Sequence, residues 1–203
     1  MKKGKTAASR SKNTQRIVDA ACELFGEKEY QEITVRDICE RAGVSGSSFY
    51  SVFAGKDEIV THVIQGMRDD SKSVIDLLIT SSSDLEKIWK LFDRILGFAL
   101  QYGPDFLKTL LFISTARDDV TRQFYQYSDW FESLVRNCQK SGIIRNLEDP
   151  KALVQAASHA AFGVGYEWSK SHGEFDLREA CFRCHESIYN VAPEYRGVWK
   201  TMQ

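Results

Sequence analysis

The residue types most able to do chemistry lie close together near the C-terminus, in "CFRCH", residues 181–185. A CxxCH pattern is that of covalent haem attachment. Haem attachment belongs to exported proteins, however, and we expect no secretory signal in this sequence. Both cysteines also fit an apolar stripe with spacings of 4, 3, 4 and 3, formed by Leu177, Cys181, Cys184, Ile188 and Val191. We therefore predict a helix-packing seam, with thiol redox sensing as the alternative.

Other combinations of reactive side chains are no stronger. No metal-ligand spacing links the histidines with one another or with Cys22 and Cys138; they are His62, His159, His172 and His185. A hydrolase triad would have to be assembled arbitrarily from the many serines. We predict no metal, no cofactor and no enzymatic activity.

A different chemistry is indicated by "GVSGSSFYSVF", residues 43–53, which has the pattern of the turn and second helix of a helix-turn-helix motif. Small or apolar residues stand where two helices packed near a right angle need them: Ile38, Cys39, Ala42, Gly43, Val44, Phe49 and Val52. The second helix nevertheless contains no Arg, Lys, Asn or Gln, the usual readers of base edges. Basic residues gather elsewhere, with six and no acid in residues 1–16.

The elements that position these residues are predicted to be helices throughout. With 203 residues, 43% hydrophobic, and only three prolines, the chain can bury a core and has long runs free of helix breakers. Apolar periodicity and capping residues predict about nine helices, the first beginning near Gln15 and another running from Lys56 to Ile79. Asp84 is expected to cap a buried helix, and Pro104 to start the next.

Residues 14–60 closely resemble the N-terminal domain of the tetracycline-repressor (TetR) family of transcriptional regulators. The resemblance is carried by the Ala20-Ala21 pair, Leu24-Phe25, Tyr30, Thr34, Ile38, Ala42-Gly43-Val44-Ser45, Phe49-Tyr50, Phe53 and Lys56. Glu29, Val52 and Gly55 depart from residues frequent in the family. The resemblance implies an all-α chain with a flexible basic arm (1–12), a three-helix DNA-binding domain (13–60) and a larger helical effector-binding and dimerisation domain (61–203).

By resemblance, phosphate contacts fall to Thr34, Arg36, Tyr50 and Lys56, and sequence readout to Ser45, Ser47 and Ser48 together with DNA shape. Gly46 is interpreted as allowing the helix N-terminus to approach the major groove closely; the alternative is a tolerated surface glycine. The implied function is a homodimeric, ligand-responsive regulator, most simply a repressor on a palindromic operator. The alternative is a small-molecule-binding or redox-sensing dimer whose DNA-binding unit has decayed.

The C-terminal region is expected to enclose a small apolar or aromatic effector. The aromatic residues predicted to line this pocket are Trp89, Phe92, Tyr102, Phe106, Phe112, Tyr125, Trp130, Phe162 and Tyr166. Dimerisation is expected through the last two helices, on a face of small residues and on the cysteine seam, with Ala156, Ala160, Gly163, Leu177, Cys181, Cys184 and Ile188 at the interface. No apolar run is long enough to span a membrane, and a cytoplasmic location is the expectation.

Overall fold

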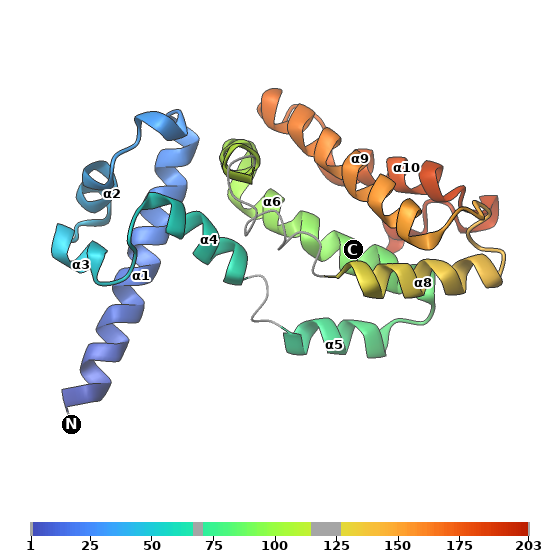
Figure 1. Cartoon of the computed structure of the whole chain (residues 1–203), viewed down its shortest axis with the longest axis horizontal. Helices are drawn as coiled ribbons and strands as arrows, with labels where there is room; N and C mark the ends of the chain where they lie inside the picture. The colour runs from blue at the N-terminus through green and yellow to red at the C-terminus, as the bar shows by residue number, and fades with distance from the viewer. Residues whose placement is uncertain (1, 67–70, 115–126, 203) are drawn as a thin grey trace.

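The computed structural model describes residues 2–66, 71–114 and 127–202, which are helical apart from turns and short connections (Figure 1). The helices are α1 (Lys2–Glu27), α2 (Val35–Ala42), α3 (Gly46–Tyr50), α4 (Lys56–Gly66), α5 (Ser71–Thr80), α6 (Asp84–Ser114), α8 (Ser128–Lys140), α9 (Pro150–Lys170) and α10 (Leu177–Tyr189), with 3₁₀ turns η1 (Tyr30–Glu32), η2 (Pro193–Tyr195) and η3 (Val198–Thr201). Within these ranges β-structure is limited to one isolated bridge, between Ile144 and Val191. The all-α prediction is confirmed.

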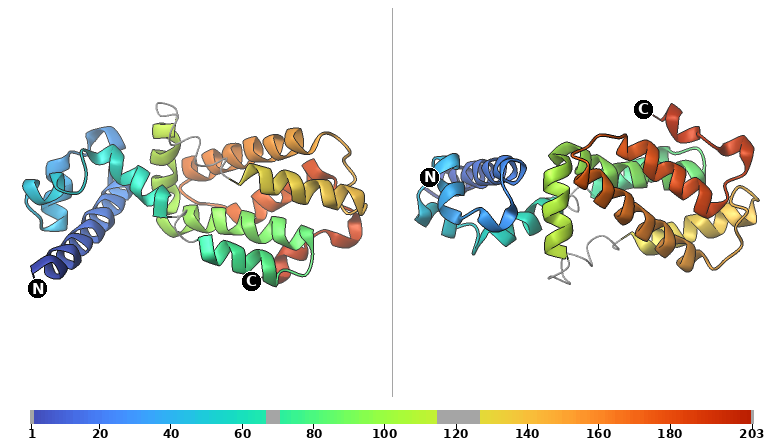
Figure 2. Two further views of the ribbon diagram at one scale, coloured as in Figure 1. Left: turned by 60° about the horizontal axis from the view of Figure 1, so that its bottom comes forward. Right: turned by 90° about the horizontal axis from the view of Figure 1, so that it is seen from above.

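The N-terminal helices form a small domain at one end of the molecule, and α4 leads from it to the larger C-terminal bundle (Figures 1 and 2). α1 packs its apolar stripe, including Ile17, Ala21 and Phe25, against α2, α3 and α4. Arg41 of α2 ties the two helices together by ion pairs with Glu23 and Glu27 of α1. The helix begins at Lys2, not near Gln15, because residues 2–14 hold no proline and many good helix formers. Residues 2–12 are thus helical where a flexible arm was expected.

The predicted helix-turn-helix is formed by α2 and α3. Thr34 and Asp37 make a reciprocal capping box at the start of α2. Gly43 ends α2 in the left-handed conformation, at φ 61°, and a side chain there would collide with the Arg16 guanidinium. Ser45 then caps α3 by accepting a hydrogen bond from the backbone N–H of Ser48. These local signals explain why the sequence predicted this motif correctly.

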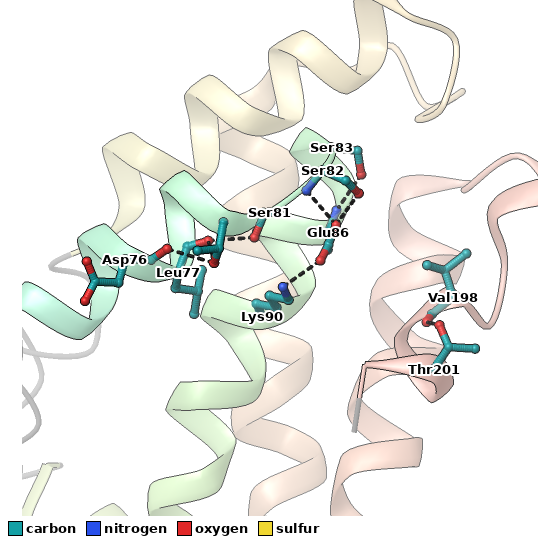
Figure 3. Close-up of polar contacts among 10 residues, drawn as sticks. Asp76, Leu77, Ser81, Ser82, Ser83, Glu86, Lys90, Val198 and Thr201 are labelled. Carbon is teal, nitrogen blue, oxygen red and sulfur yellow. Dashed lines mark hydrogen bonds and ion pairs between the residues drawn. The ribbon is translucent and has the colours of Figure 1, made fainter.

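α6 is the central helix of the C-terminal bundle and contacts α1, α5, α8, α9 and α10. Its cap is Ser83, whose Oγ accepts from the N–H of Glu86 at 3.1 Å, rather than the predicted Asp84. Glu86 in turn accepts from the N–H of Ser82 and pairs with Lys90 (Figure 3). At Gly103, with φ 84° and ψ 175°, the helix breaks direction before Pro104, as the sequence predicted. The break separates residues 84–102 from residues 104–114.

The helix predicted over Lys56–Ile79 is helical in its described parts, α4 (Lys56–Gly66) and α5 (Ser71–Thr80), and its residues 67–70 lie outside the described ranges. α9 and α10 lie side by side and cover one face of α6, whereas α5 lies on another side (Figures 1 and 2). Among the helices described, none has the length and apolar character needed to cross a lipid bilayer.

Candidate nucleic-acid interface and cavity

The N-terminus of α3 is an exposed surface whose serines are already hydrogen-bonded to one another. Ser45 Oγ lies 2.9 Å from both Ser47 Oγ and Ser48 Oγ, in addition to capping the helix. A hydroxyl group can donate one hydrogen bond and accept two, so capacity remains for an outside partner. Ser47 is exposed and Ser48 is half-buried.

Gly46 lies beside these serines at the first position of α3. A Cβ atom built at Gly46 meets nothing within 4 Å, and its backbone is helical. The fold therefore does not require glycine at this position, in contrast to Gly43. Any requirement for Gly46 has to come from something outside the chain.

Two further residues that were predicted to contact DNA, Tyr50 and Arg36, are exposed. Tyr50 is 62% exposed, with its ring held edge-on to Phe49. Arg36 is exposed on α2 and forms no hydrogen bond or ion pair with the described residues. Both side chains are thus available to an external partner, as the sequence analysis expected.

Lys56, predicted as a phosphate contact, also forms hydrogen bonds inside the protein. Its ammonium group donates to the carbonyls of Tyr30, at 2.6 Å, and of Ile33, at 2.7 Å, and lies over the Tyr30 ring. Burial lowers the pKa of this ammonium group. These two bonds join η1 to the start of α4. An ammonium group has three N–H donors, so Lys56 keeps one donor for a partner. Sequence spacing gave no sign of this packing.

The C-terminal bundle holds a partly open cavity of about 120 Å³ between α6, α8, α9 and α10. Its walls are mainly aliphatic, and among the described residues that line it none is charged. The lining includes Ile95, Leu96, Ala99, Leu107, Leu110, Leu111, Phe131, Ala157, Ala161, Gly165 and Leu177. An apolar site in the predicted domain is therefore present.

The aromatic residues expected to line this site are distributed differently. Phe92 and Phe162 do line the cavity. Trp89, Tyr102 and Phe106 pack in the core away from it, while Phe112, Trp130 and Tyr166 are about half exposed. Tyr125 lies outside the described residues. The sequence missed the aliphatic walls, because a Leu facing a cavity and a Leu facing solid core have the same helical periodicity.

His185 is the most unusual group of the lining. It is 4% exposed, and its Nδ1 lies 2.8 Å from the carbonyl oxygen of Cys181, one turn earlier in α10. Its ring lies against Phe92, with 4.0 Å between ring centroids. Burial in this apolar setting lowers the pKa of His185 to about 4. The imidazole is therefore neutral at pH 7.

We expect this histidine to make the fold acid-sensitive. Below the ordinary pKa of about 6.5, the unfolded chain binds a proton that the folded chain does not bind until about pH 4. The free energy of unfolding should therefore fall as the pH drops through this window, by about 3 kcal/mol from His185 alone. Urea unfolding at pH 7.0 and pH 4.0, compared between the natural chain and His185→Phe, measures this difference. An equal loss in both chains would contradict it.

The cavity and the N-terminal domain meet on opposite sides of the segment 104–114 of α6. Leu107, Leu110 and Leu111 face the cavity. On the other side, Phe106 packs against Phe25 of α1 with ring centroids 6.2 Å apart. Lys108 pairs with Glu29 at 2.6 Å. This ion pair gives a role to the acidic residue at position 29, where the family that the sequence resembles usually has glycine. This segment therefore contacts both the cavity and α1.

The residues predicted to form a dimer face are exposed on α9 but only partly exposed on α10. Ala156 and Gly163 are exposed, Ala160 is half-buried, and a Cβ at Gly163 meets nothing within 4 Å. Leu177 and Cys181 are fully buried inside the subunit, which leaves Cys184 and Ile188, both half-buried, on the outer side of the seam. A periodic stripe cannot show whether its partner is in the same chain or another, and here part of it packs internally.

The geometry defines a helix-turn-helix domain attached to a helical domain with an apolar cavity. Residues 17–63 match the family described as "Bacterial regulatory proteins, tetR family". The N-terminal domain is therefore a TetR-family domain, and the chain has the fold of that family of transcriptional regulators.

Individual relatives are more distant. The HTH-type transcriptional repressor KstR2 of Rhodococcus jostii is 30% identical over 80 residues, 32% of this chain and 39% of that protein. The regulator SrpR of Pseudomonas putida is 33% identical over 86 residues, 42% of this chain and 38% of its own length. The matches thus span about two fifths of these relatives. The structure of FadR from Bacillus subtilis, solved with stearoyl-CoA, shares the fold with a TM-score of 0.67 at 16% identity, covering 86% of this chain and 97% of FadR.

Proposed function

We propose that the protein is a homodimeric transcriptional repressor that binds a palindromic DNA site and is released by a small apolar effector. Two helix-turn-helix units, one from each subunit, enter successive major grooves of the site. The observation that carries the proposal is the exposed, unobstructed N-terminus of α3, where the Ser47 and Ser48 hydroxyl groups lie beside an open glycine and Ser45 caps the helix.

The composition of α3 assigns affinity and specificity to different groups. The helix has no Arg, Lys, Asn or Gln, so most of the binding free energy has to come from phosphate contacts. Arg36, Tyr50 and the third donor of Lys56 are the candidates for this role; Thr34 would first have to give up the hydrogen bond that its hydroxyl donates to Asp37. Ser45, Ser47 and Ser48 read base edges at short range, and DNA shape adds to the readout.

Effector control is supported by the position of residues 104–114. An effector that enters the cavity presses on Leu107, Leu110 and Leu111, and Phe106 on the same helix passes the shift to α1. The distance between the two DNA-reading helices of the dimer then no longer fits the half-sites. FadR from Bacillus subtilis, solved with stearoyl-CoA, and the gamma-butyrolactone receptor share this fold.

The alternative role as a thiol sensor is not favoured by the cysteines. Cys181 is fully buried, and burial raises its pKa to about 12. A reactive sensor thiol needs exposure and a lowered pKa. Cys181 and Cys184 are free and lie on the packing seam of α10, in line with the structural interpretation of "CFRCH".

Arg36→Ala should weaken binding to specific and random DNA alike. Loss of one phosphate contact should also reduce the slope of log affinity against log salt concentration by about one unit. Arg36 is exposed and forms no hydrogen bond or ion pair with described residues, so its removal should change the unfolding free energy little. Lys56→Ala is the contrasting variant, because it also breaks two internal hydrogen bonds and should lower stability. Fluorescence anisotropy across a salt series measures the slopes; an unchanged slope in Arg36→Ala would remove this residue from the interface.

The proposed function is tested by a salt-titrated mobility-shift assay with the DNA upstream of the protein's own gene. We expect a complex that survives an excess of random competitor DNA and weakens steeply with salt. If random competitor DNA displaced the protein as readily as the same upstream DNA does, no specific site would be present in that DNA. Absence of binding at low salt would favour the alternative, a dimer that binds small molecules and not DNA.

A further inference from the structure

His185 places a hydrogen-bonding atom without a protein partner at the wall of the apolar cavity. Nδ1 is occupied by the Cys181 carbonyl, while Nε2 has no partner among the described residues. Trp89 Nε1 is the buried side-chain nitrogen that is sealed in protein without a partner in the described part of the chain. Nε2 of His185 is not sealed in this way, and its residue lines the cavity.

The hydrogen bond at Nδ1 fixes the chemical character of Nε2. A carbonyl oxygen only accepts, so Nδ1 carries the imidazole proton and donates it. Because burial keeps the ring neutral at pH 7, Nε2 holds a lone pair and acts as an acceptor. The bond at Nδ1 turns that edge of the ring back toward α10, which directs Nε2 away from the helix backbone. Phe92 packs on the ring and holds it in this orientation.

The rest of the lining limits which ligands suit this acceptor. The described lining residues carry no charge, so a permanently ionised group would be buried without a counter-ion. The lining also includes Ser128, Ser158 and Tyr189, which carry hydroxyl groups; that of Ser158 already donates to the Val154 carbonyl at 2.9 Å. An ether or ketone oxygen facing Nε2 would set two lone pairs against each other. A neutral donor, such as an alcohol or phenol, is the group that fits.

We propose that the effector of this protein is an uncharged, largely apolar molecule carrying one hydroxyl group, which donates a hydrogen bond to Nε2 of His185. The proposal rests on the proposed function, since it takes the cavity as the effector site. It adds that α10 provides the polar end of that site and so selects donors over apolar molecules of equal shape.

The test uses two probes of nearly equal shape, 4-ethylphenol and 4-ethyltoluene, which differ by a hydroxyl against a methyl group. Their dissociation constants for the full-length chain are measured by calorimetry in the natural protein and in His185→Phe, which keeps an aromatic ring but removes the acceptor. The ratio of the two affinities should favour the phenol about tenfold more in the natural protein than in His185→Phe. Comparing ratios cancels the greater hydrophobicity of the toluene. Ser158→Ala is the matched control and should leave the ratio unchanged.

A second measurement does not depend on the variant folding. In nitrogen-15 spectra of the natural chain, the imidazole that resists protonation down to about pH 4 is His185. Its Nε2 signal should move on addition of 4-ethylphenol and stay in place with 4-ethyltoluene. Equal ratios in the natural protein and His185→Phe, or an unmoved Nε2 signal in the phenol-bound chain, would overturn the hydroxyl proposal while leaving the cavity as a binding site. Failure of both probes to bind would instead contradict the cavity as an effector site, and with it that part of the proposed function.

Discussion

Replacing Gly46 with leucine should abolish specific DNA binding while leaving the protein folded. A Cβ at this position meets open space, and leucine is a better helix former than glycine by about 1 kcal/mol. The free chain should therefore be as stable as the natural one or slightly more stable. On DNA, the same side chain would stand between the N-terminus of α3 and the base edges, and would keep Ser47 and Ser48 out of reach.

The expected loss is the whole specific part of the affinity, on the order of a thousandfold or more, with binding to random DNA retained. Gly46→Ala is the matched control, because it improves the helix with the smallest added volume. Anisotropy with specific and random duplexes, alongside thermal unfolding, separates the two effects. Normal specific binding by Gly46→Leu would show that the glycine is a tolerated surface residue and that α3 does not approach DNA in this way.

Gly163→Arg should convert the dimer to monomers. Gly163 lies on the exposed face of α9 with Ala156, and the added side chain has open space in the isolated subunit. In a dimer packed through this face, close approach of two helices would bury the charge without a partner, which is strongly unfavourable. A monomer holds one half-site only, so specific affinity should fall by about two orders of magnitude or more, as expected when a linked second contact is lost.

The control for this variant is Ile79→Arg, which adds the same charge to α5, at a residue that is 75% exposed. α5 and α9 lie on different sides of the bundle (Figure 2). Sedimentation velocity should show a dimer for Ile79→Arg and a monomer for Gly163→Arg. The reverse result would place the interface on α5.

The fold could be predicted where local signals decide it. The Thr34 capping box, the left-handed Gly43 and the break at Gly103 are each encoded within a few residues, and the helix-turn-helix and the helix start at Pro104 were predicted from such local signals. The start of α1 was not predicted correctly, because no helix breaker or capping residue marks the expected boundary near Gln15. The helix instead extends to Lys2.

The site was less predictable because its properties depend on distant segments. Lys56 carries the family's lysine, yet its contacts with the Tyr30 and Ile33 carbonyls follow from how η1 meets α4. Large aromatic residues suggested a pocket, but Trp89 and Phe106 proved to be core, and aliphatic side chains from four helices form the walls. In the sequence, His185 could be considered only as part of a haem pattern and as a possible metal ligand. Its imidazole is neutral and hydrogen-bonded at Nδ1 alone because the tertiary fold buries it.

The central claim is that α3, which has no Arg, Lys, Asn or Gln, reads DNA as one of a pair of such helices. It is tested most directly by selecting bound sequences from a random duplex pool. The account predicts enrichment of two inverted half-sites, with centres separated by about one helical turn or a multiple of it. The same selection with Gly46→Leu should enrich nothing. A natural protein that enriches no sequence over the starting pool, at a salt concentration where it binds DNA, would contradict the claim.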